Sequence, residues 1–169
     1  MRLLDCLRAA AASLPFLYSA AQAQTLDEAK TAIVELYAQQ SQCEYKEDGE
    51  RRLLSGFYVT RPGDHAWGPY YLLVNVIVQG PLRGGSWDVG SQSTTYLPLQ
   101  QIESWEPREV DGNPAILISC TKGYSCIAEN GFNKVPKFLW RMCGREQRDR
   151  ILNAARYATQ VVPKQALKF

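Results

Sequence analysis

A chain of 169 residues is long enough for one ordinary domain with its own hydrophobic core. Its 19 Lys and Arg residues are nearly balanced by 17 Asp and Glu residues, which leaves a formal net charge of +2. This balance offers no broad electrostatic surface to DNA, RNA or an anionic membrane, so we expect no nucleic-acid partner.

The N-terminal segment, residues 1–23, has the three-part layout of a secretory signal peptide. Arg2 and Arg8 lie in a short basic segment, and a small, apolar run follows over residues 9–20. The sequence Ala21-Gln22-Ala23 then places a small residue at both positions that a signal peptidase reads. The apolar run is shorter than the roughly 20 residues that a membrane anchor requires. We therefore predict cleavage after Ala23 and a periplasmic or secreted protein that is not inserted in a membrane.

Four cysteines follow the predicted signal peptide: Cys43, Cys120, Cys126 and Cys143. An even number in an oxidising compartment predicts two disulfides, and four cysteines allow three connectivities. We favour Cys120–Cys126 with Cys43–Cys143, because residues 116–120 and 126–128 are predicted to be the two strands of a hairpin. The spacing matches no common zinc site, and we expect no metal and no cofactor.

Helix and strand patterns cover most of the remaining chain. A capping box of Thr25 and Glu28 predicts a helix over residues 26–40, and an amphipathic pattern predicts a second helix over residues 145–159. Strands are predicted over residues 53–59, 70–78, 94–99, 103–110, 115–120, 126–129 and 138–142. The β-branched run 70–78 is predicted to lie inside a sheet, whereas Pro98 moves its strand toward a sheet edge.

This order of elements predicts an α+β fold, with an antiparallel β-sheet or a split barrel and an N-terminal and a C-terminal helix. Residues 24–160 are expected to form one domain, and residues 161–169 a loose C-terminal tail. The order resembles that of a pleckstrin-homology-like split barrel. The segment Ile118–Ile127, followed by an alanine-rich helix, also resembles small exported bacterial proteins of uncharacterised function, over Leu97 to Val162. That resemblance implies no active site.

Candidate catalytic residues are few. His65 is the single histidine and lies beside Asp64 in a turn-rich stretch, where an exposed loop position is the simpler interpretation. The segment Gly80–Ser86 lacks the lysine that a phosphate-binding loop requires. The acidic residues Glu103 and Glu106 flank Trp105, but the sequence places no second acid opposite them. The charged cluster over residues 44–52 is expected to be a solvated hairpin tip.

Aromatic residues are the remaining signal. Trp67 and Trp87 lie in Gly-, Pro- and Ser-rich segments where exposure is expected, and exposed rings often anchor a partner. Tyr71, Trp105 and Trp140 are instead expected in the core. The sequence therefore predicts a non-catalytic exported domain that binds an unknown protein or envelope component through Trp67 and Trp87. A small secreted hydrolase with an unrecognised site is the alternative.

Overall fold

The computed structural model describes residues 25–47, 50–59, 70–80, 91–130 and 133–163. The predicted signal peptide therefore lies outside the described residues. In chain order the elements are α1 (Leu26–Ala38), β1 (Cys43–Glu47), β2 (Glu50–Val59), β3 (Tyr71–Gln79), β4 (Ser91–Pro98), the 3-10 turn η1 (Leu99–Gln101), β5 (Ile102–Val110), β6 (Asn113–Cys120), β7 (Ile127–Glu129), β8 (Asn133–Val135), β9 (Lys137–Arg141) and α2 (Arg145–Val161).

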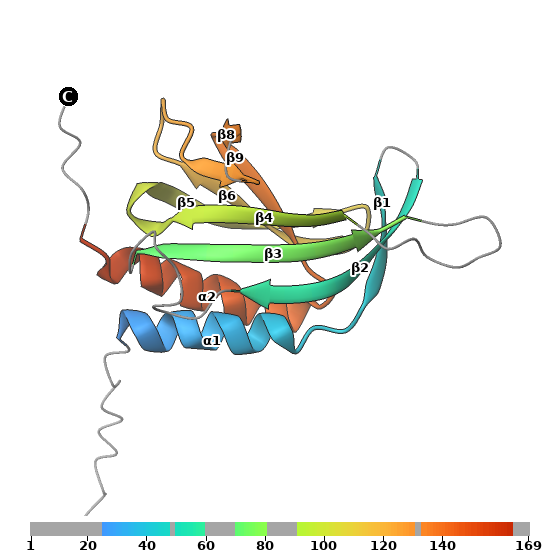
Figure 1. Ribbon diagram of the computed structural model, residues 1–169. Coiled ribbons are helices and arrows are strands. Elements are labelled where there is room, and N and C mark those ends of the chain that lie inside the picture. Colours follow the sequence, from blue (N-terminus) through green and yellow to red (C-terminus); the bar gives the residue numbers. More distant parts are fainter. Residues whose placement is uncertain (1–24, 48–49, 60–69, 81–90, 131–132, 164–169) are drawn as a thin grey trace, which may run out of the picture.

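The predicted α+β class is confirmed. In the described part of the chain, nine strands form two antiparallel sheets, and the two helices pack side by side below them (Figure 1). The large sheet has the order β1-β2-β3-β4-β7-β8, and the small sheet has the order β5-β6-β9. The two sheets do not close into a barrel, so the antiparallel sheet of the prediction describes the fold.

The first helix begins where the sequence predicts. The Thr25 hydroxyl accepts a hydrogen bond from the Glu28 N–H, and the Glu28 carboxylate accepts one from the Thr25 N–H. These two bonds satisfy N–H groups that have no partner inside the helix. Ile33 and Tyr37 of the apolar stripe are fully buried, and the helix ends at Ala38, two residues before the expected end.

The large sheet confirms one strand position and corrects another. The third strand lies between β2 and β4, as its β-branched run predicts. The fourth strand, however, is not at an edge, because it pairs with β3 along its length and with β7 at Thr95 and Tyr96. The Leu99 N–H donates to the Tyr70 carbonyl. Because bonded and non-bonded residues alternate along an antiparallel ladder, the Pro98 nitrogen points away from β3. On that other side, β7 ends before it reaches Pro98. A proline at this position costs no ladder bond.

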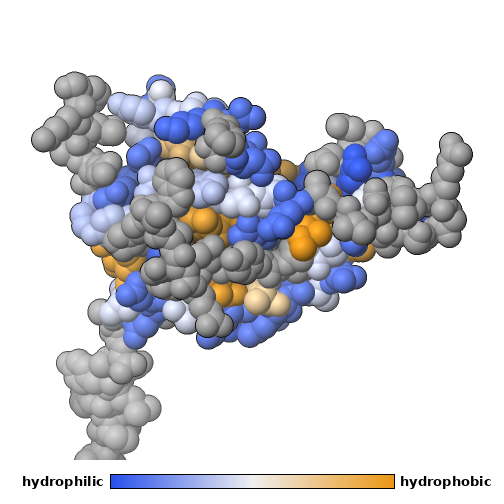
Figure 2. Space-filling model, viewed as in Figure 1, coloured by the Kyte–Doolittle hydropathy of each residue, from blue (hydrophilic) through white to orange (hydrophobic). Residues whose placement is uncertain are grey.

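The outward face of the large sheet is partly apolar. Residues 72–75 of β3 are all buried, whereas Ile77, further along the strand, is 38% exposed. Figure 2 shows apolar surface over the strands in the middle of this face, among hydrophilic residues. Single exposed apolar residues of this kind are common on protein surfaces and need no partner.

The small sheet begins with a tight hairpin. Asp111 and Gly112 form its two-residue turn with φ values of 52° and 79°. A two-residue hairpin turn with both φ values positive matches the twist of the flanking strands, and glycine takes this conformation without steric cost. The predicted turn between these strands is therefore confirmed.

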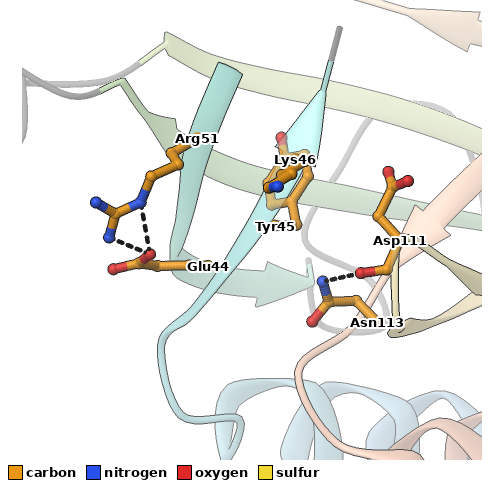
Figure 3. A pocket seen from close by; sticks show the side chains of 6 residues that line it. All are labelled: Glu44, Tyr45, Lys46, Arg51, Asp111 and Asn113. Carbon is orange, nitrogen blue, oxygen red and sulfur yellow. Dashed lines mark hydrogen bonds and ion pairs between the residues drawn. The ribbon is translucent and has the colours of Figure 1, made fainter. Parts of the chain in front are cut away.

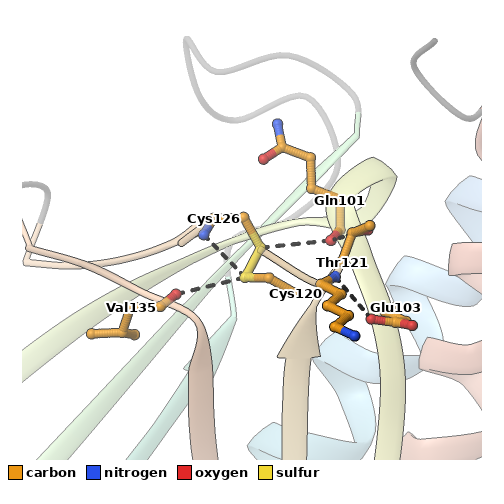
Figure 4. The surroundings of a disulfide bond; sticks show 7 residues. Gln101, Glu103, Cys120, Thr121, Cys126 and Val135 are labelled. Atoms are coloured by element: carbon orange, nitrogen blue, oxygen red, sulfur yellow. Dashed lines mark hydrogen bonds between the residues drawn. A yellow bond between two sulfur atoms is a disulfide. The ribbon is translucent and has the colours of Figure 1, made fainter. Parts of the chain in front are cut away.

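The predicted hairpin around Cys120 and Cys126 is wrong, although the bond between them is present. Strand β6 already pairs with β5 on one side and β9 on the other, so it has no free edge for a third strand. The chain instead turns at Gly123, where φ is 88°, and β7 joins the large sheet. The Cys120–Cys126 disulfide therefore links the end of the small sheet to the start of a strand in the large sheet (Figure 4).

The second helix packs against both α1 and the small sheet. Ile151, Ala155 and Ala158 are fully buried, and the helix continues to Val161, two residues beyond the expected end. Val162 is only 3% exposed, so the folded part extends past the expected boundary at residue 160. No helix among the described residues is both long enough and apolar enough to span a membrane.

The second disulfide joins Cys43, at the start of β1, to Cys143, between β9 and α2. Both bonds have the pairing that the sequence favours.

The double variant Cys43→Ala/Cys143→Ala should lose about 4–5 kcal/mol of unfolding free energy, because a bond across a sequence separation of 100 residues greatly restricts the unfolded chain. The variant Cys120→Ala/Cys126→Ala, with a separation of 6, should lose about 2 kcal/mol. Urea denaturation measures both values, and a larger loss in the second variant would contradict this order.

A buried hydrogen bond connects α2 to the small sheet. The Trp105 indole N–H donates to the Thr159 hydroxyl at 2.8 Å. Thr159→Val should therefore destabilise the protein by about 1–3 kcal/mol, because the indole N–H is left buried without an acceptor. In the Trp105→Phe background, Thr159→Val should lower the free energy of unfolding by clearly less. A double-mutant cycle in urea tests this, and equal costs in both backgrounds would show that the bond contributes nothing.

The buried hydroxyl of Tyr37 predicts a loss of stability in alkali. Burial raises the pKa of Tyr37 well above its ordinary value of 10, and the Trp140 side chain partly offsets this shift. In the unfolded chain the hydroxyl ionises near pH 10, whereas in the folded protein it stays neutral. Its contribution is therefore complete below pH 10 and is lost as the pH rises further. Tyr37→Phe should show a shallower decline above pH 10 in urea melts, and an unchanged decline would contradict the assignment.

Candidate binding surface

Strands β1 and β9 of the two sheets approach each other at one end, and we call the gap between these strands the β1–β9 seam. At one end the Cys43–Cys143 disulfide holds the strands together, with Cα atoms 5.4 Å apart. Next to it, the Arg141 guanidinium lies over the Tyr45 ring, 4.4 Å from the ring centroid. Beyond these contacts the two strands share no ladder, since they belong to different sheets. The seam is thus fixed at one end and unpaired further along.

An apolar cleft of about 140 Å³ opens at the seam. The large sheet contributes inward-facing side chains, and β9 contributes four consecutive residues. Leu54 is buried, whereas Val76 and Val78 are only half-buried. The residues that line the cleft are Tyr45, Leu54, Val76, Val78, Ser93, Phe138, Leu139, Trp140 and Arg141. The hydrophobic core is therefore not fully covered along β9.

A polar groove of about 470 Å³ lies beside the cleft and shares Tyr45 with it. Figure 3 shows the groove between the β1–β2 hairpin and the β5–β6 turn, which carries Asp111 and Asn113. Its other lining residues are Glu44, Lys46 and Arg51. The Arg51 Nε–H donates to the Glu44 carboxylate at 3.0 Å, but both side chains are about half exposed, so this ion pair adds little to stability.

The backbone hydrogen bonds determine which groups of β9 face the seam. The Met142 N–H donates to the Pro114 carbonyl at 2.9 Å, at one end of the β6–β9 ladder. Because bonded and non-bonded pairs alternate in an antiparallel ladder, the even-numbered residues of β9 bond to β6. Lys137, Leu139 and Arg141 therefore direct their N–H and C=O groups away from β6. Within the described residues, no strand pairs with this side of β9.

The opposite edge of the small sheet is covered. The Arg156 guanidinium donates to the Trp105 carbonyl from Nε at 3.1 Å and from Nη2 at 2.8 Å. Pro107, in the same strand, has no N–H to offer. Helix α2 and a proline thus block pairing along β5, which is how many proteins protect a sheet edge. Strand β9 has no comparable cover among the described residues.

A third cavity, of about 350 Å³, lies between β5 and α2 and is lined by Glu103, Ser104, Trp105, Arg156, Thr159 and Gln160. Its polar groups are largely engaged in holding the helix, through the Trp105–Thr159 and Arg156–Trp105 bonds. The Glu103 carboxylate accepts from the Lys122 N–H at 3.1 Å, and that of Glu106 pairs with Arg108 at 2.6 Å. Each acid has its own partner, and the two do not form a facing pair.

The predicted site residues divide into two groups. The four cysteines are paired as favoured, and the charged cluster lies on the β1–β2 hairpin, as expected. His65, Trp67 and Trp87 lie outside the described residues, so the binding role of the two tryptophans stays a prediction. Among the described residues, no group of three or more His, Cys, Asp or Glu side chains could hold a metal ion.

Sequence reasoning missed Tyr45, Arg141 and the β9 edge. The alternation around Tyr45, with charged neighbours on both sides, is a signal that could have placed its ring toward the interior. No local signal marks the β9 edge, because it depends on which strands pair across the whole chain. Comparison with known proteins gives no match to a family model, to a curated protein or to a solved structure. Function is therefore argued from the residues of this chain.

Proposed function

We propose that this protein is an exported, non-catalytic domain that binds a protein partner at the β1–β9 seam. The observation that carries the proposal is a strand edge that no strand of the described residues pairs, beside a cleft into the hydrophobic core. Half-buried valines there would lose further contact with water when a partner covers them, and this burial favours association.

Export is supported by two kinds of evidence. Two disulfides join distant parts of the fold, and such bonds persist in oxidising compartments such as the periplasm or the extracellular space. The N-terminal pattern of basic, apolar and small residues is that of a secretory signal peptide. Together they support a periplasmic or secreted location.

The size of the cleft favours a polypeptide over a free small molecule. Sites for small molecules usually have volumes of roughly 300–1,000 Å³, whereas the apolar cleft has about 140 Å³. A partner that places one or two side chains in the cleft and its backbone along β9 fits this size better. The bond at Cys43 and the Arg141–Tyr45 contact hold the seam in position before binding, which reduces the ordering cost of association.

Nothing in the described residues specifically favours the hydrolase alternative. Its main candidate, His65, lies outside them. Trp67 and Trp87 lie outside the described residues and stay candidate contact residues on the basis of the sequence alone.

Site-specific photo-crosslinking tests the proposed function. A photoreactive residue at position 137, on β9, should form adducts with a partner in an exporting host, whereas the same residue at the exposed position 150, on α2, should not. Because cross-linking requires close contact, the yield at position 137 should exceed that at position 150 by about tenfold. Equal yields at the two positions, or no adduct at either, would contradict binding at the seam.

A further inference from the structure

We infer that the polar groove between the β1–β2 hairpin and the β5–β6 turn binds a small zwitterion, the chemistry of a free amino acid or a short unblocked peptide. The carboxylate of the ligand would lie at Lys46, and its ammonium group at Asp111. This inference goes beyond the proposed function, because it concerns the polar groove and neither the apolar cleft nor the β9 edge.

The dimensions of the groove suit a small ligand. Its volume is about 470 Å³, which lies within the range of roughly 300–1,000 Å³ that is usual for small-molecule sites. Its walls come from two different sheets, with Lys46 on β1 and Asp111 in the turn between β5 and β6 (Figure 3). Polar groups that converge on one groove from separate elements are typical of a ligand site.

Both walls are held in place by contacts within the protein. Strand β1 is fixed by the Cys43–Cys143 bond, two residues before Tyr45, and the Tyr45 ring is only 5% exposed. On the other wall, Asp111 belongs to the tight two-residue hairpin turn, where its φ of 52° is set by the strands on either side. Binding would therefore order little more than the Lys46 side chain, which keeps the entropic cost of association low.

The charges in the groove are balanced, but only half of them are paired. The Arg51 guanidinium donates to the Glu44 carboxylate, so these two charges neutralise each other. Neither the Lys46 ammonium group nor the Asp111 carboxylate has a hydrogen bond or an ion pair within the described residues. Both residues are exposed. One cation and one anion thus remain available to a ligand, on different walls of one groove.

The register of the hairpin favours a carboxylate at Lys46. Lys46 lies directly opposite Arg51 in the β1–β2 ladder. Like charges on facing residues weaken the pairing of two strands, and a bound anion would relieve this repulsion. Because Glu44 already pairs with Arg51, Lys46 is the position at which an added carboxylate gains most.

Two opposite charges select a ligand that carries both. A simple anion would be attracted by Lys46 but repelled by Asp111, and for a simple cation the two signs are reversed. A neutral ligand would gain at neither end. A zwitterion with its carboxylate toward Lys46 and its ammonium group toward Asp111 gains at both, so it is the favoured occupant.

An NMR titration with blocked and unblocked triglycine tests this site. Unblocked triglycine carries both charges, acetyl-triglycine only the carboxylate, triglycine amide only the ammonium group, and acetyl-triglycine amide neither. Unblocked triglycine should shift the backbone amide signals of Lys46, Asp111 and Asn113. It should bind about threefold or more tightly than either singly charged peptide, since one exposed ion pair contributes modestly. Glycine, titrated in parallel, distinguishes a free amino acid from a peptide, and preferred binding of either one supports the site.

Matched variants assign each charge of the ligand to one residue. Lys46→Gln should weaken binding of triglycine and of acetyl-triglycine about threefold, and leave that of triglycine amide unchanged. Asp111→Asn should weaken binding of triglycine and of triglycine amide to the same extent, and asparagine keeps the turn because it tolerates a positive φ. The controls Lys134→Gln, on the opposite edge strand of the large sheet, and Asp27→Asn, in the first turn of α1, make the same charge changes outside the groove. Both should leave all affinities nearly unchanged.

Four outcomes would overturn the inference. The first is an absence of shifts in the groove with both glycine and triglycine at millimolar concentrations. The second is equal binding of the neutral and the unblocked peptide, which would show that charge has no part in recognition. The third is binding of a singly charged peptide as tightly as triglycine, which would remove the role of Lys46 or of Asp111. The fourth is an equal effect of Lys46→Gln and Lys134→Gln, which would indicate a response to net charge alone.

Discussion

The covalent bond between Cys43 and Cys143 is the constraint on which the rest of the arrangement depends. It joins the first strand of the large sheet to the segment between β9 and α2, so both sheets and the second helix meet at one point. The first helix is tied to the same point, because the Gln40 side-chain carbonyl accepts a hydrogen bond from the Cys143 N–H at 2.8 Å. With this end fixed, the core can remain open along the other end of the seam without the two sheets separating.

The two edges of the small sheet show contrasting solutions to one problem. Unpaired strand edges promote uncontrolled association, and proteins usually cover them or place charges on them. Strand β5 is covered by Arg156 and interrupted by Pro107. Strand β9 instead carries the exposed cation Lys137. Positive charge on an edge strand opposes pairing with an identical strand.

Local sequence signals predicted the elements well, and long-range pairing much less. The capping box at Thr25 and the turn at Asp111-Gly112 are formed by neighbouring residues, so their chemistry can be recognised in the sequence. The pairing of Cys120 with Cys126 was also correct, but for the wrong reason. A hairpin was expected because the residues are close in sequence, whereas β9, which follows later in the chain, occupies the edge that the hairpin required.

The same limitation explains why the candidate surface was not predicted. Pro98 suggests an edge strand. Its missing N–H, however, falls at a position that β7 does not reach, so no ladder bond is lost. This can be recognised only once the register of the strands is known. The β9 edge is defined by the absence of a neighbour in the described fold, and the short run 137–141 has no pattern of its own that indicates this. Trp67 and Trp87 were chosen from composition, which indicates exposure but not position relative to the seam.

Hydrogen exchange at the β9 amides tests the central claim most directly. An edge that no strand of the described residues pairs predicts fast exchange at Lys137 and Leu139 and slow exchange at Phe138 and Trp140, because only the even-numbered amides donate to β6. Slow exchange at Lys137 and Leu139 would contradict an open β9 edge and, with it, binding at the seam.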